Sequence, residues 1–109
     1  MYTVLMIWLL FHPPPKPEFM KISWYGKQHH GRLTASGIKF NMNELTAAHK
    51  TLPFGTKLQI THKENWITVI INDRGPYIQG RHLDVSYAAA KALDMIGEGV
   101  IIGKVYKLK

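Results

Sequence analysis

The 109-residue chain contains no cysteine, which excludes a disulfide scaffold and a thiolate zinc site. Its longest apolar run, residues 2–11, has only about half of the roughly 20 residues that a membrane-spanning helix needs. The chain also lacks a phosphate-binding glycine loop, a serine in a nucleophile elbow and histidines at a fixed metal-ligand spacing. These absences predict a protein without a metal or another cofactor, and they argue against nucleophilic catalysis.

Acidic residues are few. Seven Asp and Glu stand against fourteen Lys and Arg, which gives a formal net charge of +7 with neutral histidines. Such an excess attracts anionic partners, but the basic residues are scattered along the chain, as on an ordinary soluble surface. No nucleic-acid-binding motif accompanies them, so we expect no nucleic-acid partner. The length and the hydrophobic share of 46% predict one compact domain, which we expect to be monomeric.

From residue 20 onward, short apolar patterns separated by turn residues predict a mostly-β domain. Alternating or β-branched residues predict strands around Ile22–Trp24, 57–62, 66–72 and 100–108, with a hairpin turn at Lys63–Asn65. Helix-start signals predict two short helices, one over 41–48 and one from the N-cap Ser86 to Met95. Without a repeating βαβ order, the pattern fits a small closed barrel better than a doubly wound sheet.

Two ionisable side chains lie at the edges of predicted turns. Asp73 follows the apolar segment 67–71 and precedes Arg-Gly-Pro, so its carboxylate should emerge at the rim of a barrel. His49 ends an alanine-rich segment before a Leu-Pro break. An imidazole and a carboxylate at such positions can carry general acid–base chemistry. The residues alone leave simpler alternatives open, with Asp73 as a turn cap and His49 as a core histidine bonded to backbone.

Five short motifs occur with the residues, and in the order, of a known family. They are Ser-Trp-Tyr-Gly (23–26), Leu-Thr-Ala-Ser-Gly (33–37), the segment 45–53 around Thr-Ala-Ala-His, Asn-Asp-Arg-Gly-Pro (72–76) and Leu-Asp-Val-Ser-Tyr-Ala-Ala-Ala (83–90). From about Ile22 to Leu108 the chain resembles the rare lipoprotein A family, which shares its fold with the first domain of plant expansins. The resemblance implies a mostly-β, six-stranded double-psi β-barrel with one or two short helices, over residues 20–109.

The same resemblance implies an activity. The family includes lytic transglycosylases, which cleave peptidoglycan glycan strands between N-acetylmuramic acid and N-acetylglucosamine and leave 1,6-anhydro ends without using water. In the family, the Asp of Asn-Asp-Arg-Gly-Pro is the proposed catalytic acid, and the His of Thr-Ala-Ala-His is placed beside it. The resemblance therefore implies Asp73 as general acid and base, with His49 assisting through a hydrogen bond.

One departure from the family concerns an acidic residue. Where well-known members carry Glu just after Thr-Ala-Asn/Ser-Gly, this chain has Ile38, which can neither donate, accept nor carry charge. Glu44 could compensate for this loss, or could simply favour the first turn of a helix. The replacement puts activity in question, not the fold.

Further side chains are expected to bind the glycan. Asp84 matches a family position, although a carboxylate near a helix N-terminus is favoured whatever the function. Arg74 could hold a sugar hydroxyl or a carboxylate, or could lock its loop by pairing with Asp84. The rings of Trp24, Tyr25 and Tyr77 could stack on sugars, with core burial as the alternative, above all for Trp24.

Residues 1–19 combine the apolar run with a proline-rich spacer and are expected to precede the folded domain. Three interpretations of residues 2–11 remain open: a degenerate export signal, a weak membrane tether, or an apolar tail. We favour export, and hence a periplasmic or envelope-associated protein, because the chain resembles a wall-directed family. Without cysteine, it cannot carry the lipid anchor of that family's lipoproteins.

Two functional hypotheses follow. The first is a lytic transglycosylase that acts through Asp73 and His49. The second is a non-catalytic, expansin-like module that binds glycan or cell wall, which the presence of Ile38 favours. A nucleic-acid-binding module has only the net charge in its support.

Overall fold

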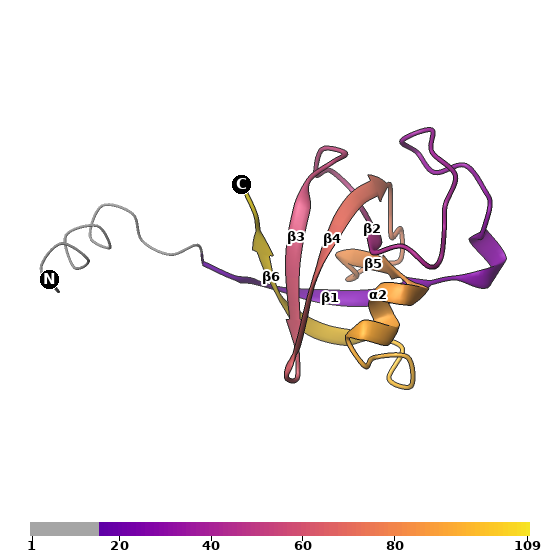
Figure 1. The fold of residues 1–109 in the computed structure, drawn as a ribbon. Coiled ribbons are helices and arrows are strands. Elements are labelled where there is room, and N and C mark those ends of the chain that lie inside the picture. The colour runs from indigo at the N-terminus through magenta and orange to yellow at the C-terminus, as the bar shows by residue number, and fades with distance from the viewer. Residues whose placement is uncertain (1–15) are drawn as a thin grey trace, which may run out of the picture.

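The computed structural model describes residues 16–109, so the interpretations of residues 2–11 lie outside the described residues. Six strands, one 3₁₀ turn and one α-helix make up this part of the chain (Figure 1). In chain order they are β1 (Glu18–Tyr25), η1 (Lys27–His29), β2 (Thr46–His49), β3 (Lys57–His62), β4 (Asn65–Asp73), β5 (Leu83–Ser86), α2 (Tyr87–Ala92) and β6 (Ile101–Lys107). Within residues 16–109, no helix has the length and hydropathy to cross a membrane.

The strands close into a barrel in the order β1-β5-β2-β4-β3-β6 (Figure 1). The pairs β1–β5 and β2–β4 are parallel, and the other neighbours pair antiparallel. Parallel partners here are never consecutive in the chain, so crossing connections join them. This is a double-psi β-barrel, which confirms the predicted fold class. Closure gives every strand two neighbours, so this small domain has no open sheet edge to cover.

Alternation along each strand fills the barrel with branched aliphatic side chains. Its fully buried members include Ile22, Leu58, Ile60, Val69, Ile71, Leu83 and Val85. Gly103 of β6 faces this core, where a β-carbon would lie 2.8 Å from Cδ1 of Ile22. Glycine is therefore required at this position by space, because the neighbouring side chain already occupies the site.

The helix predicted over 41–48 is wrong. Thr46–His49 forms strand β2, with β4 on one side and β5 on the other. The side chain of Asn41 closes a local turn instead: its Oδ1 accepts from the N–H of Asn43 at 2.9 Å, and its Nδ2 donates to Oε1 of Glu44 at 3.1 Å. Pairing in the barrel overrides the helix propensity of Ala47 and Ala48, since a strand's stability depends mainly on its neighbours.

The second predicted helix begins as expected but ends early. Ser86 is its N-cap, with Oγ accepting from the N–H of Ala89 at 3.2 Å. Helix α2 stops at Ala92 rather than Met95. Asp94 adopts φ +55°, and the turn that it makes carries the side chain of Met95 into the core, where it is fully buried. Burial of an apolar side chain thus decides where the helix ends.

The other predicted strands and the hairpin are confirmed, with small shifts at their ends. The hairpin between β3 and β4 turns at Lys63 and Glu64, where Lys63 has φ +55°. Strand β1 begins at Glu18, two residues before the expected start of the domain. Glu18 and Phe19 pair with β6 and so belong to the barrel.

Candidate active site

Strand pairing sets four residues in one row across the barrel wall. Ser23 of β1 pairs with Asp84 of β5, Asp84 pairs with Ala48 of β2, and Ala48 pairs with Asp73 at the end of β4. Neighbouring strands lie about 4.8 Å apart, so the Cα atoms of Asp84 and Asp73 are about 10 Å apart. Only the methyl group of Ala48 stands between them, which leaves the space between the two carboxyl groups open.

Asp84, Ala48 and Asp73 of this row lie on the floor of a groove with a volume of about 220 Å³. Its lining includes Asp73, Asp84, Ala48, Tyr25 and His29, and the loop from Arg74 to Ile78 that follows β4. In that loop, Gly75 has φ +123°, a conformation that a side chain would strain. The Arg-Gly-Pro motif thus shapes one wall of the groove.

The carboxylate of Asp73 is held by three donors. The backbone N–H groups of Ala35 and Arg74 each donate to Oδ1 at 2.9 Å, and the hydroxyl of Tyr25 donates to Oδ2 at 3.4 Å. The contact with Arg74 is the turn cap that the sequence allowed, and it does not remove the carboxylate from the groove. Ala35 belongs to the Leu-Thr-Ala-Ser-Gly motif, so this motif orients Asp73 through its backbone.

Asp84 is the half-buried carboxyl group of the groove. Burial raises its pKa above the ordinary value, and the hydrogen bond from Oγ of Ser23 at 3.1 Å opposes this shift only in part. A carboxyl group with a raised pKa keeps its proton to a higher pH than a solvated one. Asp84 is therefore a candidate general acid, a role that the sequence did not give it.

Tyr25 does not present its ring to the groove as a sugar platform. It is only 8% exposed and stacks on Phe40 with ring centroids 4.5 Å apart. Burial raises the pKa of its hydroxyl, and the nearby charge of Asp73 adds to the effect, so the hydroxyl stays protonated and donates. Its function in this structure is to support Asp73.

Tyr77 and Arg74 differ in their availability to a ligand. Tyr77 is 79% exposed on the groove wall, so its ring is free to stack on a sugar. The guanidinium of Arg74 lies 4.0 Å from the ring centroid of Phe54, and its Nη1 donates to the carbonyl of His49 at 3.1 Å. Arg74 thus locks its loop through these contacts, not through the pairing with Asp84 that the sequence suggested.

Trp24 and Glu44 lie outside the lining of the groove. Trp24 points inward, packs against the core and contacts the ring of Tyr87, with centroids 5.8 Å apart. Glu44 is exposed and accepts from the amide of Asn41. Ile38, at 65% exposed, also lies outside the lining, so the residue at this departure from the family faces solvent.

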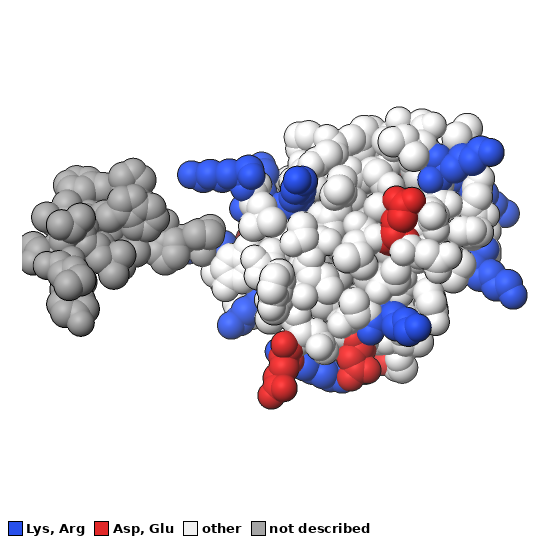
Figure 2. Space-filling view, viewed as in Figure 1, with Lys and Arg blue, Asp and Glu red and all other residues white. Residues whose placement is uncertain are grey.

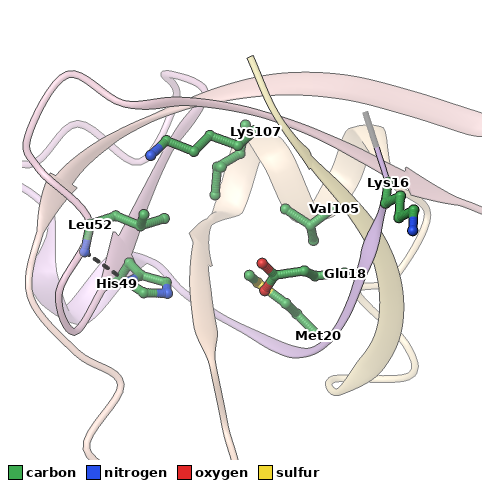
Figure 3. A pocket seen from close by; sticks show the side chains of 8 residues that line it. Lys16, Glu18, Met20, His49, Leu52, Val105 and Lys107 are labelled. Carbon is green, nitrogen blue, oxygen red and sulfur yellow. Dashed lines mark hydrogen bonds between the residues drawn. The ribbon is translucent and has the colours of Figure 1, made fainter. Parts of the chain in front are cut away.

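His49 follows Ala48 on β2 but points to the other side of the strand. It lines a separate cavity of about 260 Å³, together with Glu18, Met20 and Lys107 (Figure 3). Figure 3 shows the ring of His49 and the carboxylate of Glu18 pointing toward one another. The structure therefore does not bring His49 to Asp73, because successive side chains of a strand face opposite sides.

The imidazole of His49 is used to hold its own turn. Its Nδ1 accepts from the N–H groups of Thr51 and Leu52, at 3.1 and 3.0 Å. Burial lowers the pKa of His49, and the positive charge of Arg74 lowers it further. The ring is therefore neutral near pH 7, with its proton on Nε2. This is the backbone-bonded histidine that the sequence left open as an alternative.

Sequence reasoning did not select His29 and Ala48, which line the groove, or Ser23, which donates a hydrogen bond to Asp84. The signal for Ser23 and Ala48 is the strand register, which places them on either side of Asp84 and is visible only in the folded barrel. Among residues 16–109, no group of three or more His, Asp or Glu side chains could hold a metal ion.

The sequence can now be compared with known proteins. The family described as "Lytic transglycolase" matches residues 19–105. The chain belongs to this family of RlpA-like double-psi β-barrels. Over 89 residues it is 60% identical to the "Probable endolytic peptidoglycan transglycosylase RlpA" of Aquifex aeolicus, which covers 78% of this chain and 39% of that protein. Over 79 residues it is 49% identical to the "Endolytic peptidoglycan transglycosylase RlpA" of Campylobacter jejuni, which covers 71% of this chain and 29% of that protein. The chain thus spans less than half the length of either relative.

Solved structures share the fold at low sequence identity. An expansin of Clavibacter michiganensis in complex with cellohexaose aligns with a TM-score of 0.70 at 16% identity, over 85% of this chain and half of that one. The Streptomyces papain inhibitor aligns with a TM-score of 0.67 at 21% identity, over 87% of this chain and 96% of the inhibitor. At these identities the likeness shows the fold alone.

Proposed function

We propose that this domain is a peptidoglycan lytic transglycosylase, which cleaves the bond between N-acetylmuramic acid and N-acetylglucosamine and leaves a 1,6-anhydro end. The observation that carries the proposal is the pair of carboxyl groups, Asp73 and Asp84, in one groove with open space over Ala48. The similarity to proteins named endolytic peptidoglycan transglycosylases supports the same reaction class. The substrate would place the protein at the cell envelope.

The chemistry can be divided between the two carboxyl groups. Asp84, whose pKa is raised by burial, donates its proton to the glycosidic oxygen as the bond to the anomeric carbon breaks. The C6 hydroxyl of the same muramic acid attacks that carbon, and Asp73 accepts the hydroxyl proton. The products are a 1,6-anhydro ring and a free 4-hydroxyl on N-acetylglucosamine, and no water is consumed. A hydrolase would instead need its carboxylates placed for water or for a covalent step.

This division revises the assignment drawn from the sequence. There, Asp73 served both as acid and as base with help from His49. In the groove, Asp84 takes the acid step, Tyr25 and the backbone of Ala35 orient Asp73, and Tyr77 is free to stack on a sugar. His49 contributes to the turn at Thr51–Leu52 and has no part in proton transfer.

The test uses the purified full chain with two substrates, intact sacculi and glycan strands stripped of their peptides. Mass spectrometry should detect new anhydro ends with the wild-type protein and none above background with Asp73→Asn or Asp84→Asn. Asp94→Asn is the matched control, because Asp94 is an exposed carboxylate outside the groove and asparagine tolerates its positive φ. Binding to sacculi without any anhydro ends would overturn the proposal and favour the expansin-like module.

A further inference from the structure

Two large aromatic side chains are exposed on the barrel wall and do not line the groove. Phe19 of β1 is 63% exposed and Trp66 of β4 is 65% exposed. Exposed aromatic rings of this size lose the free energy that burial would provide, and their presence on a sheet face indicates a contact surface.

The strand registers place both rings in one line. Phe19 pairs with Lys104 of β6, Lys104 pairs with Thr61 of β3, and Thr61 pairs with Trp66. We call these four residues the aromatic row. It crosses three strand spacings, so its ends are about 14 Å apart. A row of this length can contact more than one sugar ring of an extended strand.

Polar and basic side chains occupy the outward positions next to the aromatic row. Gln59, Thr68 and Tyr106 form the next row, with amide and hydroxyl groups beside Trp66 and Thr61. Lys21, Lys57, Ile70 and Ile102 occupy further outward positions of β1, β3, β4 and β6. Figure 2 looks onto β3 and β4, and most of the area over them is white, with charged side chains around it. The acidic residues of these four strands lie at strand ends, with Glu18 of β1 at the cavity and Asp73 of β4 in the groove.

We propose that the aromatic row binds a wall glycan strand outside the catalytic groove. Phe19 and Trp66 stack on sugar faces, and the hydroxyl and amide groups between and beside them bond to sugar hydroxyls. The ammonium of Lys104 pairs with a carboxylate of the polymer, on a peptide-free muramic acid or on a stem peptide. The choice of a glycan over a second copy of the chain rests on charge, since the lysines complement an acidic polymer and would repel each other across a self-paired face. This inference rests on the proposed function for the identity of the polymer.

The experiment measures binding separately from cleavage. Purified full-length Phe19→Thr/Trp66→Thr protein is sedimented with insoluble sacculi, and its bound fraction is compared with that of wild type and of Leu33→Thr. Leu33 is a matched control, because it is 72% exposed but lies on a loop away from the aromatic row. We expect roughly tenfold weaker binding for the double variant and wild-type binding for the control, since stacking contributes on this order.

A short soluble glycan that fills only the groove should be cleaved at the wild-type rate by the double variant. Lys104→Gln should weaken binding at low salt more than at high salt, since it removes a charge. Circular dichroism establishes that each variant is folded. Added glycan fragments should quench the tryptophan fluorescence of the wild-type protein, and this quenching should be lost in Trp66→Thr. The quenching is a second measure of the contact between Trp66 and the glycan.

The outcomes separate this inference from the proposed function. The inference is overturned if the folded double variant binds sacculi as wild type does. It is also overturned if sedimentation shows that removing the two rings converts a dimer into a monomer. Neither outcome changes the proposed chemistry of the groove. Wild-type protein that makes no anhydro ends, yet loses binding when the two rings are removed, overturns the proposed function and retains the aromatic row.

Discussion

The groove around Asp73 and Asp84 and the cavity around His49 are both lined by residues of the short strand β2. The two sites contact opposite faces of this strand. Ala48 faces the groove and His49, the next residue, faces the cavity. The Thr-Ala-Ala-His motif therefore supplies two sites: its second alanine gives the groove its open floor, and its histidine bonds the turn beside the cavity. Neighbours within a sequence motif need not meet in one site when the motif is a strand.

The two regions also differ in charge. The groove holds two carboxyl groups, one of which burial drives toward its neutral form. The cavity brings together Lys16, Lys107, Glu18 and a histidine whose pKa is lowered. The groove therefore contains the carboxyl group whose pKa burial raises, and the proposed function assigns acid catalysis to this group.

The largest effect on activity is expected at Asp73 in the groove, and the matched change at His49 in the cavity is expected to have little effect. Asp73→Asn should reduce the formation of anhydro ends by at least about 100-fold, the usual scale of a lost acid–base group. His49→Asn should change this rate by less than about threefold, because an amide oxygen can still accept from the turn. Initial rates on peptide-free glycan, read by mass spectrometry, measure both. Equal losses in the two variants would contradict the separation of groove from cavity.

A second change fills the floor of the groove. Ala48→Val adds two methyl groups between the carboxyl groups, and we expect roughly tenfold lower kcat/KM, because the sugar can no longer sit at its reactive position. The melting temperature should be measured in parallel, since extra volume in a packed site also costs stability. Full activity in a folded Ala48→Val protein would show that the substrate does not pass between Asp84 and Asp73.

A smaller effect is expected at the support of Asp73. Tyr25→Phe keeps the stacking on Phe40 but removes the hydroxyl that donates to Oδ2. We expect a fall in kcat of about three- to tenfold with little change in KM, as for the loss of one hydrogen bond to a charged group. A change confined to KM would instead indicate that Tyr25 contacts the sugar. Phe40→Leu, which disturbs only the packing beneath the ring, serves as the control.

The smallest effect concerns the cavity and depends on pH. Because the pKa of folded His49 lies below its ordinary value of 6.5, the unfolded chain takes up a proton first as pH falls. The neutral imidazole of His49 therefore stabilises the folded state fully above about pH 6.5. This stabilisation is lost as pH falls toward the lower pKa of His49 in the folded state. Urea unfolding of wild type and His49→Asn between pH 8 and pH 5 measures it. The free-energy difference between the two should shrink on acidification, and a constant difference would contradict the neutral imidazole.

A mostly-β barrel could be predicted from the sequence because the local sequence signals agree with the observed structure in most segments. The β-branched residues of β4 favour a strand, and Ser86 favours the start of a helix, without help from the rest of the fold. The prediction failed at Thr46–His49, where two alanines favour a helix locally and only pairing with β4 and β5 makes a strand. The end of α2 was also missed, since burial of Met95 is a tertiary effect.

The candidate site divides in the same way. The position of Asp73 at a rim could be predicted because Asp73 follows an apolar strand and precedes a turn motif. The acid role proposed for Asp84 could not be predicted from spacing, because its raised pKa results from burial in the assembled groove. The placement of His49 failed for a geometric reason: the bulge between β2 and β4 at Ala47–Ala48 and the alternation of β2 decide which side each residue faces.

Strand β1 connects these regions, because Phe19 belongs to the aromatic row, Glu18 lines the cavity and Tyr25 lines the groove. Ser23 of the same strand donates a hydrogen bond to Asp84. Deleting one residue between Phe19 and Ser23 would rotate one end of the strand by half a turn relative to the other. The barrel core, the support of Asp73 and the outer rings would then be lost together. Relatives of this domain should consequently vary β1 by substitution and keep its length unchanged.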